Sequence, residues 1–492
     1  MKTLKELTDR LAHAGLIQRR LGLDETLSID HLANDSRKVG PGGLFVAIRG
    51  GQTDGHMFIE KTVLNGAIAI VCEAMPEEAR ERFPGIAFVQ VRDARAALAE
   101  LAACFYGDPT RELRLVGVTG TNGKTTTAYL MHHLFETLGV KTGLLSTIEY
   151  RIGAEVLEAT HTTPDVLDTN RLFRRMVDEG CGACSMEVSS HALDQERVRA
   201  FVFAAALFTN LTRDHLDYHG SMDAYRDAKK RLFDTLSPDA AAVYNADDPA
   251  GAYMVSGTRA RATSFGRTQQ ADVLFDILGS RLDGLRLRLD GTERRFRLVG
   301  AFNAYNLAGA YAAGRALGYG AAETIDALCE ARPVPGRFEY LTDGRNRTVI
   351  VDYAHTPDAL ENILRAVRDV MPPDARLWCV FGCGGDRDRD KRRIMGSIAE
   401  AGADRVIVTS DNPRTEDPEA ILNDIRRGMS RPTDALWIVD RREAIRESAA
   451  RSADGDVVLI AGKGHEPYQV IGKEKFPFDD REEAKTWFNS AT

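Results

Sequence analysis

Residues 113–147 place a glycine-rich turn between an apolar strand and a helix. LRLVGVTG (113–120) is typical of a buried strand that enters a turn, and TTTAYLMHHLFETLG (125–139) predicts a helix that ends at Gly139. VKTGLLST (140–147) then opens another strand. Strand, helix and strand at this spacing indicate a parallel sheet covered by helices, so the chain is predicted to belong to the α/β class.

A second α/β region follows the proline-rich segment ARPVPGRFE (331–339). Its helix is predicted in TPDALENILRAVRDV (356–370), with Thr356 as the cap. Ligands of open α/β sheets bind beyond the carboxyl ends of the strands. Four predicted strands run into polar loops at that position: RTVIVDYAH (347–355), RLWCVFGCGGD (376–386), ADRVIVTSDNPR (403–414) and DVVLIAGKGHE (456–466).

The length of 492 residues suggests about three domains. Two segments rich in turn residues, YGDP (106–109) and ARPVPGRFE, are candidate linkers. We therefore expect domains at residues 1–108, 109–335 and 336–492.

Composition limits the possible partners and the compartment. The net charge is −8 and the Lys and Arg residues are scattered among acids, which argues against a nucleic-acid surface. Seven cysteines, an odd and sparse set, favour a reducing compartment, so we expect a cytosolic protein. The N-terminal MKTLKELTDRLAHAG predicts an amphipathic helix without the apolar core of a signal peptide, and the apolar run FVFAAALF (201–208) is too short to span a membrane.

The pair Cys181 and Cys184 forms a CxxC pattern. Small buried residues before a strand are the favoured interpretation. Redox chemistry, or zinc binding together with Cys379 and Cys383, is the alternative.

The turn GVTGTNGKTTT (117–127) has the composition of a phosphate-binding loop. Backbone N–H groups at a glycine-rich turn and a helix N-terminus form a cradle for anions. Lys124 would reach the β- and γ-phosphates, and the Thr125 hydroxyl would face Mg²⁺. The spacing departs from the usual G-x4-GK[ST] pattern, because Gly117 comes one residue too early and Val118 occupies the expected glycine position.

Two further predicted strands end in acidic and imidazole side chains. Glu187 lies in SMEVSSHAL (185–193), and Asp214, His215 and Asp217 lie in TNLTRDHLDYHG (209–220). Beside a phosphate loop these side chains suit Mg²⁺ ligation, whereas each histidine alone is more often an ordinary surface residue.

Two predicted helices carry polar residues in unusual settings. AYRDAKKRLF (224–233) puts Lys229 on one face with Tyr225 and Phe233, although lysines are usually solvated. GAFNAYNLAGAYAAG (300–314) places Asn303 and Asn306 on one side. An amide there could read an adenine edge or simply cap a packed helix.

Ten segments together resemble the Mur ligases of bacterial cell-wall synthesis, over the whole chain. Within that family the pattern is most similar to the MurE-type branch, which adds meso-diaminopimelate to UDP-N-acetylmuramoyl-L-alanyl-D-glutamate in peptidoglycan precursor synthesis. The segments are, in order, GVTGTNGKTTT, MEVSSHALDQERV, NLTRDHLDYHG, YRDAKKRLF, GAFNAYNLAGA, PGRFE, VDYAHTPDAL, GCGGDRDRDKR, SDNPR and AGKGHE.

The resemblance implies an N-terminal UDP-binding domain, a central P-loop ATPase and a C-terminal Rossmann-like domain that binds the amino acid. It also implies a reaction: ATP converts a substrate carboxylate to an acyl phosphate, which the incoming amine attacks. Two anions must approach each other in this chemistry, so cations are needed between them. We expect a monomer whose partners are small-molecule substrates.

The nucleotide and metal residues are carried over from the family. The expected ATP ligands are Gly120, Thr121, Asn122, Gly123, Lys124, Thr125, Thr126, Asn306, Arg337, Asp352 and His355. The catalytic residues would be Lys124, Glu187, His215 and Lys229, and the ligands of two Mg²⁺ ions would be Thr125, Glu187, His215 and Lys229. Lys229 matches a lysine that the family carbamylates with CO₂, although its neighbour Lys230 has the same chemistry.

The substrate residues are also implied by the resemblance. Those for the UDP-muramoyl dipeptide are Ser36, Thr162, Thr163, Ser189, Gln195 and Arg197. Those for diaminopimelate are Arg387, Asp411, Asn412, Arg414, Gly462 and Glu466. Guanidinium groups suit the distal carboxylate of this amino acid, and Glu466 suits its ammonium. L-lysine lacks that carboxylate and would leave the Arg387 and Arg414 slot unfilled.

Three other functions share part of this pattern. A folylpolyglutamate synthetase-like ligase shares the ATPase chemistry but should lack the N-terminal domain and the DNPR segment. A lysine-adding ligase on the same scaffold usually lacks the Asn–Arg pair, and a nucleotide-dependent switch needs neither Lys229 nor two distant arginines. One departure from the family is Arg393, which stands where a proline is common.

Overall fold

The computed structural model describes residues 2–22, 24–50 and 53–489. The chain divides into two compact units, both of α/β type. The first comprises Met1–Gly117, Val140–Ala204 and Thr235–Ala240, and the second comprises Val118–Gly139, Ala205–Asp234 and Ala241–Thr492. Among the described residues, no helix has both the length and the apolar character that crossing a membrane requires.

The first unit begins with a five-stranded sheet of order β2-β7-β6-β5-β4. Its strands are β2 (Ile17–Leu21), β4 (His31–Ala33), β5 (Gly43–Val46), β6 (Ala67–Cys72) and β7 (Ala87–Val91). Helices α1 (Leu4–His13) and α4 (Ala94–Phe105) share one apolar core with this sheet. The predicted N-terminal helix is therefore present, and it begins at Leu4 because Thr3 and Glu6 form a capping box.

The first unit also holds the strand that ends at Glu187 and the strands beside it. β12 (Ala183–Glu187) pairs in parallel with β9 (Thr142–Leu145), which continues antiparallel into β10 (Glu149–Ile152) and β11 (Glu155–Glu158). Helix α6 (Val166–Asp178) precedes β12, and α7 (Ser190–Asp194) follows it. Glu187 ends its strand, as the sequence predicted.

The second unit contains the phosphate loop, which leads from β8 (Arg114–Thr119) into α5 (Lys124–Thr137). Helices α9 (Met222–Asp234), α11 (Ala301–Ala316) and α12 (Ala321–Cys329) belong to the same unit. Its parallel strands are β13 (Ala205–Phe208), β14 (Ala241–Asn245), β15 (Arg261–Gly266) and β16 (Val273–Arg281), and β17 (Gly284–Leu289) and β18 (Thr292–Phe296) extend them antiparallel.

A six-stranded sheet of order β19-β20-β24-β21-β22-β23 follows in the second unit. Its strands are β19 (Glu339–Thr342), β20 (Thr348–Asp352), β21 (Leu377–Phe381), β22 (Arg405–Val408), β23 (Leu436–Trp437) and β24 (Val457–Ala461). All but β19 are parallel, so the four predicted polar loops leave the same edge of the sheet.

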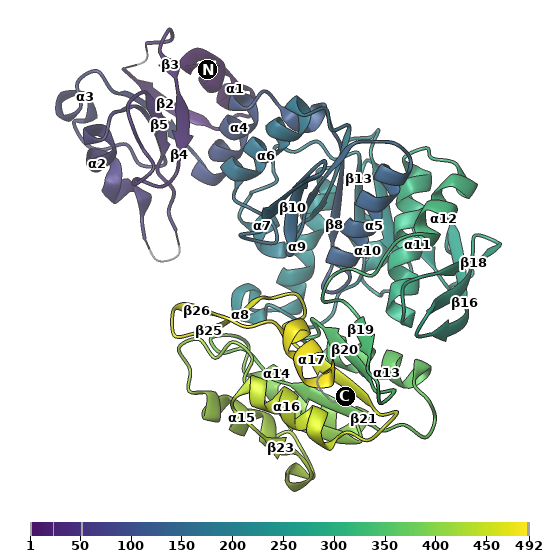
Figure 1. Cartoon of the computed structure of the whole chain (residues 1–492). Coiled ribbons are helices and arrows are strands. Elements are labelled where there is room, and N and C mark those ends of the chain that lie inside the picture. Colours follow the sequence, from purple (N-terminus) through teal and green to yellow (C-terminus); the bar gives the residue numbers. More distant parts are fainter. Residues whose placement is uncertain (1, 23, 51–52, 490–492) are drawn as a thin grey trace. The chain divides into compact units, whose positions relative to one another are not determined.

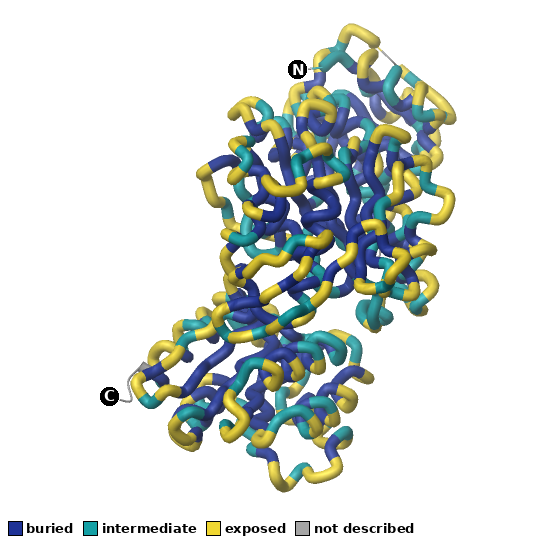
Figure 2. The backbone as a smooth tube through the Cα atoms, turned by 90° about the vertical axis from the view of Figure 1, so that its right-hand side faces the viewer, coloured by how far each residue is buried: buried dark blue, intermediate teal, exposed yellow. Residues whose placement is uncertain are grey.

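Helices cover both faces of this sheet (Figure 1). They are α13 (Pro357–Val370), α14 (Asp390–Gly402), α15 (Pro418–Arg426), α16 (Arg441–Arg451) and α17 (Asp480–Asn489). Alternate residues of one strand enter different cores: Ile350 packs with α13 and α14, whereas Val349 and Val351 pack with α16 and α17. β20, β21 and β24 are buried along their whole length, and Figure 2 draws buried backbone in dark blue through the interior. Burial on both faces explains why these strands read as continuous apolar runs.

One strand-end prediction is wrong. Asp214, His215 and Asp217 do not end a strand, because β13 stops at Phe208 and the chain then crosses a loop. His215 instead caps the short helix α8 (Leu216–His219), and Asp217 lies within that helix.

Candidate functional site

Two glycines shape the phosphate loop. Gly120 has φ +149° and Gly123 has φ +84°, backbone conformations that side chains rarely adopt. A Cβ at Gly120 would collide with the Thr209 hydroxyl, and a Cβ at Gly123 would collide with the Asn306 amide. The loop therefore needs glycine at both positions to pack against its neighbours.

The segment after β13 fixes the loop from one side. Thr121 N donates to Asn210 O (2.8 Å), and Asn122 N donates to Asn210 Oδ1 (2.9 Å). The Thr209 hydroxyl donates to Asn122 O (2.6 Å). Thr209 and Asn210 were missed by the sequence reasoning, and the signal was the run TNLTRDH directly after a strand.

The first intrahelical hydrogen bond of α5 runs from Thr127 N to Gly123 O (2.9 Å). The N–H groups of residues 124–126, in the first turn of α5, have no acceptor inside the helix, which is what an anion cradle requires. The side chain of Asn122, an expected ATP ligand, donates to Asp358 Oδ2 (2.7 Å). The predicted loop residues 120–126 are thus brought together around a helix N-terminus.

Lys124 and Lys229 converge on one backbone carbonyl. The Lys124 ammonium donates to Gly120 O (3.0 Å) and Thr121 O (2.8 Å), and Lys229 Nζ donates to Gly120 O (2.7 Å). Burial, and next the charge of Lys124, hold the pKa of Lys229 well below its ordinary value. The structure thus favours a neutral amine at Lys229.

Helix α9 buries Lys229 on its apolar face. Tyr225, Lys229 and Phe233 are each at most 1% exposed, and Lys229 Nζ lies 4.4 Å from the centre of the Tyr225 ring. Its neighbour Lys230 forms an ion pair with Asp234 instead. The expectation of a solvated Lys229 from the pattern alone is wrong, and the structure separates two lysines that have the same chemistry.

His215 has a left-handed backbone, with φ +55°, which is uncommon outside glycine. Its Nε2 lies 3.4 Å from Asp214 Oδ2. Burial alone would raise the pKa of Asp214, but His215, His355 and Lys391 hold it below the usual value. A carboxylate whose side chain is 15% exposed therefore lies beside His215, the predicted metal ligand.

The expected nucleotide residues of the linker and β20 contact the phosphate loop or each other. Arg337 Nη2 donates to Thr125 Oγ1 (3.2 Å), and its guanidinium lies 4.3 Å above the ring of Tyr353. Arg337 Nε is buried and has no hydrogen-bond partner in the part of the chain that the structure describes. Asp352 accepts from Phe338 N, and burial raises its pKa.

His355 and Asn306 complete this set. His355 Nδ1 lies 2.9 Å from Tyr353 O, and desolvation lowers the pKa of its imidazole. Asn306 Nδ2 donates to Asn303 Oδ1 (2.9 Å), so the two amides lie on one side of α11 as predicted. The Asn306 side chain contacts the phosphate loop through the Thr127 hydroxyl at 3.4 Å.

The first unit gathers most of the expected dipeptide residues after β12. Thr147 N and Thr147 Oγ1 both donate to Glu187 Oε1 (2.8 and 3.1 Å), and Thr147 Oγ1 lies 3.0 Å from Thr162 Oγ1. The Thr163 hydroxyl donates to Glu187 O (2.9 Å) and accepts from Ser189 N (3.1 Å). Thr147 was missed by the sequence reasoning.

Arg197 is fixed beside this group. Its Nη1 donates to Thr163 O (2.9 Å), and its Nε and Nη2 donate to Gln195 Oε1 (3.1 and 2.6 Å). These three hydrogen bonds hold the guanidinium of Arg197 in place. Ser36 lies elsewhere, in the loop between β4 and β5, where its carbonyl accepts from Asn65.

The loops after β22 and β24 share a buried polar cluster. Lys463 Nζ donates to Asn412 Oδ1 and to Glu466 Oε2, both at 3.0 Å. Asn412 Nδ2 donates to the same Glu466 oxygen (2.9 Å). A Cβ at Gly462 would approach within 2.6 Å of Asp411 Oδ2, which explains the glycine. The expected residues Asp411, Asn412, Gly462 and Glu466 are therefore neighbours.

Arg414 and Arg387 flank Gly384. A Cβ at Gly384 would lie 2.9 Å from Arg414 Nη1 and 3.9 Å from Arg387 Cγ. The hydrogen-bond acceptors of Arg414 are the backbone carbonyls of Gly385 (2.8 Å) and Asn412 (3.5 Å). Burial, and next the charge of Arg387, lower the pKa of Arg414. An added carboxylate would be attracted to this pair.

The buried Arg392 links the loop that follows β21 to the loop that follows β22. Arg392 donates to both oxygens of Glu416 (2.8 and 3.0 Å), to Asp424 (3.0 Å) and to Gly384 O (3.3 Å). The hydrogen bonds of Arg392 hold the pKa of Glu416 at about 2. Arg392 was not predicted, and the neighbouring departure at Arg393 lies on the exposed side of α14.

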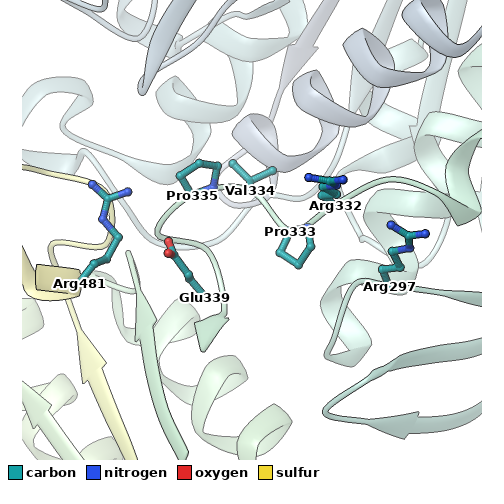
Figure 3. Close-up of a pocket in the computed structure, with 7 residues that line it drawn as sticks. All are labelled: Arg297, Arg332, Pro333, Val334, Pro335, Glu339 and Arg481. Carbon is teal, nitrogen blue, oxygen red and sulfur yellow. The ribbon is translucent and has the colours of Figure 1, made fainter. Parts of the chain in front are cut away.

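An open cleft of about 440 Å³ lies along the linker that precedes β19 (Figure 3). Figure 3 shows residues 332–335 along its wall, with Arg481 at one end and Arg297 at the other. Arg481 is paired with Asp479, and Arg297 with Glu330. None of the predicted site residues lines the cleft.

The cysteines pack as apolar residues. Burial raises the pKa of Cys379 and of Cys383 to about 12, and it also raises the pKa of Cys184. Zinc is bound by thiolates, which these environments disfavour. Within residues 2–22, 24–50 and 53–489, no three His, Cys, Asp or Glu side chains gather in a way that could hold a metal ion.

Comparisons with known proteins identify the family. Models of the Mur ligase family catalytic domain, the Mur ligase middle domain and the Mur ligase glutamate ligase domain match residues 28–106, 118–314 and 336–464. The chain is also 46% identical to the UDP-N-acetylmuramoyl-L-alanyl-D-glutamate–2,6-diaminopimelate ligase of Cytophaga hutchinsonii, over 91% of this chain and 92% of that protein. The chain belongs to the Mur ligase family.

Solved structures agree with this Mur ligase fold. A UDP-N-acetylmuramoyl-L-alanyl-D-glutamate–2,6-diaminopimelate ligase structure is 33% identical, with a TM-score of 0.69 over 99% of this chain and 98% of that one. Folylpolyglutamate synthase of Mycobacterium tuberculosis is 19% identical, with a TM-score of 0.60 over 75% of this Mur ligase and 93% of that chain. The family and the three-domain architecture predicted from the sequence are confirmed.

Proposed function

We propose that this Mur ligase is an ATP-dependent amide ligase that adds meso-2,6-diaminopimelate to UDP-N-acetylmuramoyl-L-alanyl-D-glutamate. ATP would phosphorylate the D-glutamate side-chain carboxylate of the dipeptide, and the amine would displace phosphate from that acyl phosphate. Residues 1–108 would bind the UDP part, residues 109–335 the ATP, and residues 336–492 the amino acid. The three family matches fall inside these bounds.

One observation carries the choice of amino acid. Arg414 and Arg387 flank Gly384, and Arg414 bonds to backbone carbonyls there. The side chains of Asn412 and Glu466, from neighbouring loops, are hydrogen-bonded to each other (2.9 Å). A carboxylate and an ammonium on one carbon atom match this arrangement, because guanidinium groups bind the first and a carboxylate binds the second. L-lysine would leave the two arginines without an anion.

The dipeptide would bind to residues that the structure holds in fixed orientations. Arg197 is anchored through Thr163 and Gln195, and its guanidinium is proposed to bind a substrate carboxylate. Ser189 caps α7, and its hydroxyl accepts from Ala192 N. Thr162 and Ser36 would make further polar contacts with the dipeptide and the UDP part.

The nucleotide would bind at the cradle before α5. The N–H groups of residues 123–126 and the Lys124 ammonium would bind the phosphates, with residues 120–122 shaping the turn, and Lys124 would exchange its two carbonyl acceptors for phosphate oxygens. Asn306 is proposed to contact the adenine, and Asp352 and His355 would reach the nucleotide. The buried Arg337 Nε, which has no partner in the described chain, would gain one from the nucleotide.

Magnesium fits part of the donor set in the second unit. Mg²⁺ prefers oxygen ligands, and the Thr125 hydroxyl and a carbamate on Lys229 would supply them, with His215 as a nitrogen ligand. Carbamylation needs a neutral amine, which the burial of Lys229 provides. Glu187 is the proposed ligand from the first unit. Bound Mg²⁺ would supply positive charge between phosphate and carboxylate oxygens.

We further propose a cytosolic monomer that acts on small molecules only. Light scattering coupled to size exclusion would give 54.1 kDa for a monomer and twice that mass for a dimer.

ADP release tests the proposed function. We expect release only when ATP, Mg²⁺, the UDP-muramoyl dipeptide and meso-diaminopimelate are all present, with bicarbonate in the buffer. Omission of any one substrate serves as the control. ADP release that does not depend on the dipeptide would contradict the ligase assignment.

A further inference from the structure

Lys463 is a fully buried cation that the proposed chemistry does not use. Its side chain has no exposed surface, and it lies in the loop directly after β24. Its ammonium contacts two side chains, Asn412 Oδ1 and Glu466 Oε2, each at 3.0 Å. Burying an ammonium is costly unless its hydrogen bonds are made, so this position is a specialised one.

Lys463 determines which way the Asn412 amide points. Asn412 Oδ1 accepts from Lys463 Nζ and from Val470 N (2.9 Å), while Nδ2 donates to Glu466 (2.9 Å). A flipped amide would set its NH₂ group against two donors and its oxygen against a carboxylate. Because Nδ2 carries two hydrogens and Glu466 accepts one, the second can be offered to a substrate carboxylate.

Lys463 also orients Glu466. The Glu466 oxygen Oε2 accepts from Lys463 and Asn412, and Oε1 accepts from the Tyr353 hydroxyl at 3.4 Å. Three donors from three different loops or strands therefore hold this carboxylate. The Lys463 ammonium therefore contacts both groups that are expected to bind the substrate head group, the Asn412 amide and the Glu466 carboxylate.

The cluster around Lys463 contains several buried charges of both signs. Arg441 and Asp480 form a fully buried pair, with Arg441 Nε and Nη2 donating to both Asp480 oxygens (2.8 and 2.7 Å). Burial alone would raise the pKa of Asp411, but Lys463 and then Arg441 hold it below its usual value. Arg414 also lies within the electrostatic reach of Asp411 and Glu466, so Lys463 is one of three cations among three carboxylates.

We propose that Lys463 is a positioning residue for the amino-acid substrate: it fixes Asn412 toward the substrate carboxylate and Glu466 toward the substrate ammonium. This inference rests on the proposed function, because it assumes that these side chains bind diaminopimelate. Lys463 itself does not touch the substrate.

Steady-state kinetics of Lys463→Met test the inference. We expect the KM for meso-diaminopimelate to rise at least tenfold and the preference for it over L-lysine to fall at least tenfold. The KM values for ATP and for the UDP-muramoyl dipeptide should stay within twofold. Lys463→Gln, which keeps an N–H donor, should restore part of the loss.

Lys485→Met is the matched control. Lys485 also pairs with a glutamate three residues away, Glu482, at 2.8 Å, but this pair is exposed on α17. We expect wild-type kinetics from this variant.

The possible results distinguish a failure of the inference on Lys463 from a failure of the proposed function. Unchanged KM and unchanged preference in Lys463→Met would overturn the inference. Loss of ATP binding in both Lys463 variants would show a purely structural role and would also overturn it. A wild-type enzyme that does not use diaminopimelate would instead overturn the proposed function, and with it the substrate part of the inference.

Discussion

Lys229 Nζ donates a hydrogen bond to Gly120 O at 2.7 Å, and Lys124 Nζ donates to the same oxygen at 3.0 Å. Lys229 is buried, and the nearby charge of Lys124 repels a second positive charge there. Its pKa is therefore held well below the ordinary value, which favours the neutral amine that CO₂ requires. A carbamate would replace this repulsion by attraction between opposite charges.

Replacing Lys229 by Ala should lower kcat on the order of 100-fold, because a group that places charge at the reaction centre is lost. Short carboxylic acids should restore part of the activity by supplying the missing carboxylate. In wild-type protein kept in carbon-13 bicarbonate, NMR should show a carbamate signal that Lys229→Ala lacks.

Lys230→Ala is the control for this experiment, because Lys230 pairs with Asp234 outside the site. We expect near-normal activity and an intact carbamate signal. Full activity in Lys229→Ala would remove Lys229 from the mechanism.

Gly123→Ala should weaken ATP binding at least tenfold. The new Cβ would collide with the Asn306 amide and would also occupy a left-handed backbone. Gly139→Ala, at the other end of α5, is matched in φ (+79° against +84°) and has open space around the added atom. It should show only the backbone cost, about 1–2 kcal/mol of unfolding free energy. Calorimetric ATP titration measures the first effect and urea unfolding the second. Equal ATP affinities for Gly123→Ala and Gly139→Ala would contradict the steric account.

The alternation of strands and helices was predictable because it depends on local patterns. The four C-terminal strands are buried on both faces and read as apolar runs, and their polar loops leave one edge of the sheet. The cap at Thr356 was likewise visible in the residues, since Thr before Pro is a common helix start.

The roles of single polar residues were less predictable, because they depend on contacts between distant segments. Lys229 was expected in solvent from its residue type, yet its place between Tyr225 and Phe233 on an apolar face was the available signal. Lys463 and Asn210 lie in loops, where sequence alone cannot tell a buried polar group from a solvated one. His215 was misplaced because the strand before it ends seven residues earlier.

Arg414→Ala should reduce kcat/KM for meso-diaminopimelate on the order of 100-fold, because loss of one partner of a buried charged contact typically costs 2–5 kcal/mol. Turnover of L-lysine, which lacks the distal carboxylate, should change little. Parallel assays with both amino acids measure the ratio of kcat/KM for meso-diaminopimelate to kcat/KM for L-lysine. Arg393→Ala, an exposed neighbour of the cluster, should keep the wild-type ratio. An equal loss with both amino acids would place Arg414 outside carboxylate recognition.

Acid should weaken the ion pair between Glu416 and Arg392 and thereby lower the stability of the fold. The pKa of Glu416 is about 2 in the folded protein, below its ordinary value of 4.5. The folded state therefore binds fewer protons than the unfolded state between these values, so this contribution to stability is complete above pH 4.5 and is lost as the pH falls toward 2.

Urea unfolding of Glu416→Gln between pH 5 and pH 3 tests this expectation. The variant should be less stable than the wild type at pH 5 and should lose less stability on acidification. Glu419→Gln, at an exposed position nearby, should follow the wild-type curve. Parallel curves for Glu416→Gln and wild type would contradict the assigned role of Glu416.

A competition assay tests the central claim most directly. The protein would receive UDP-N-acetylmuramoyl-L-alanyl-D-glutamate, ATP, Mg²⁺, bicarbonate and equal amounts of meso-diaminopimelate and L-lysine, and mass spectrometry would identify the product. The two arginines beside Asn412 predict a tripeptide that contains diaminopimelate, with ADP formed in equal amount. A lysine-containing product, or ADP without any tripeptide, would contradict the account.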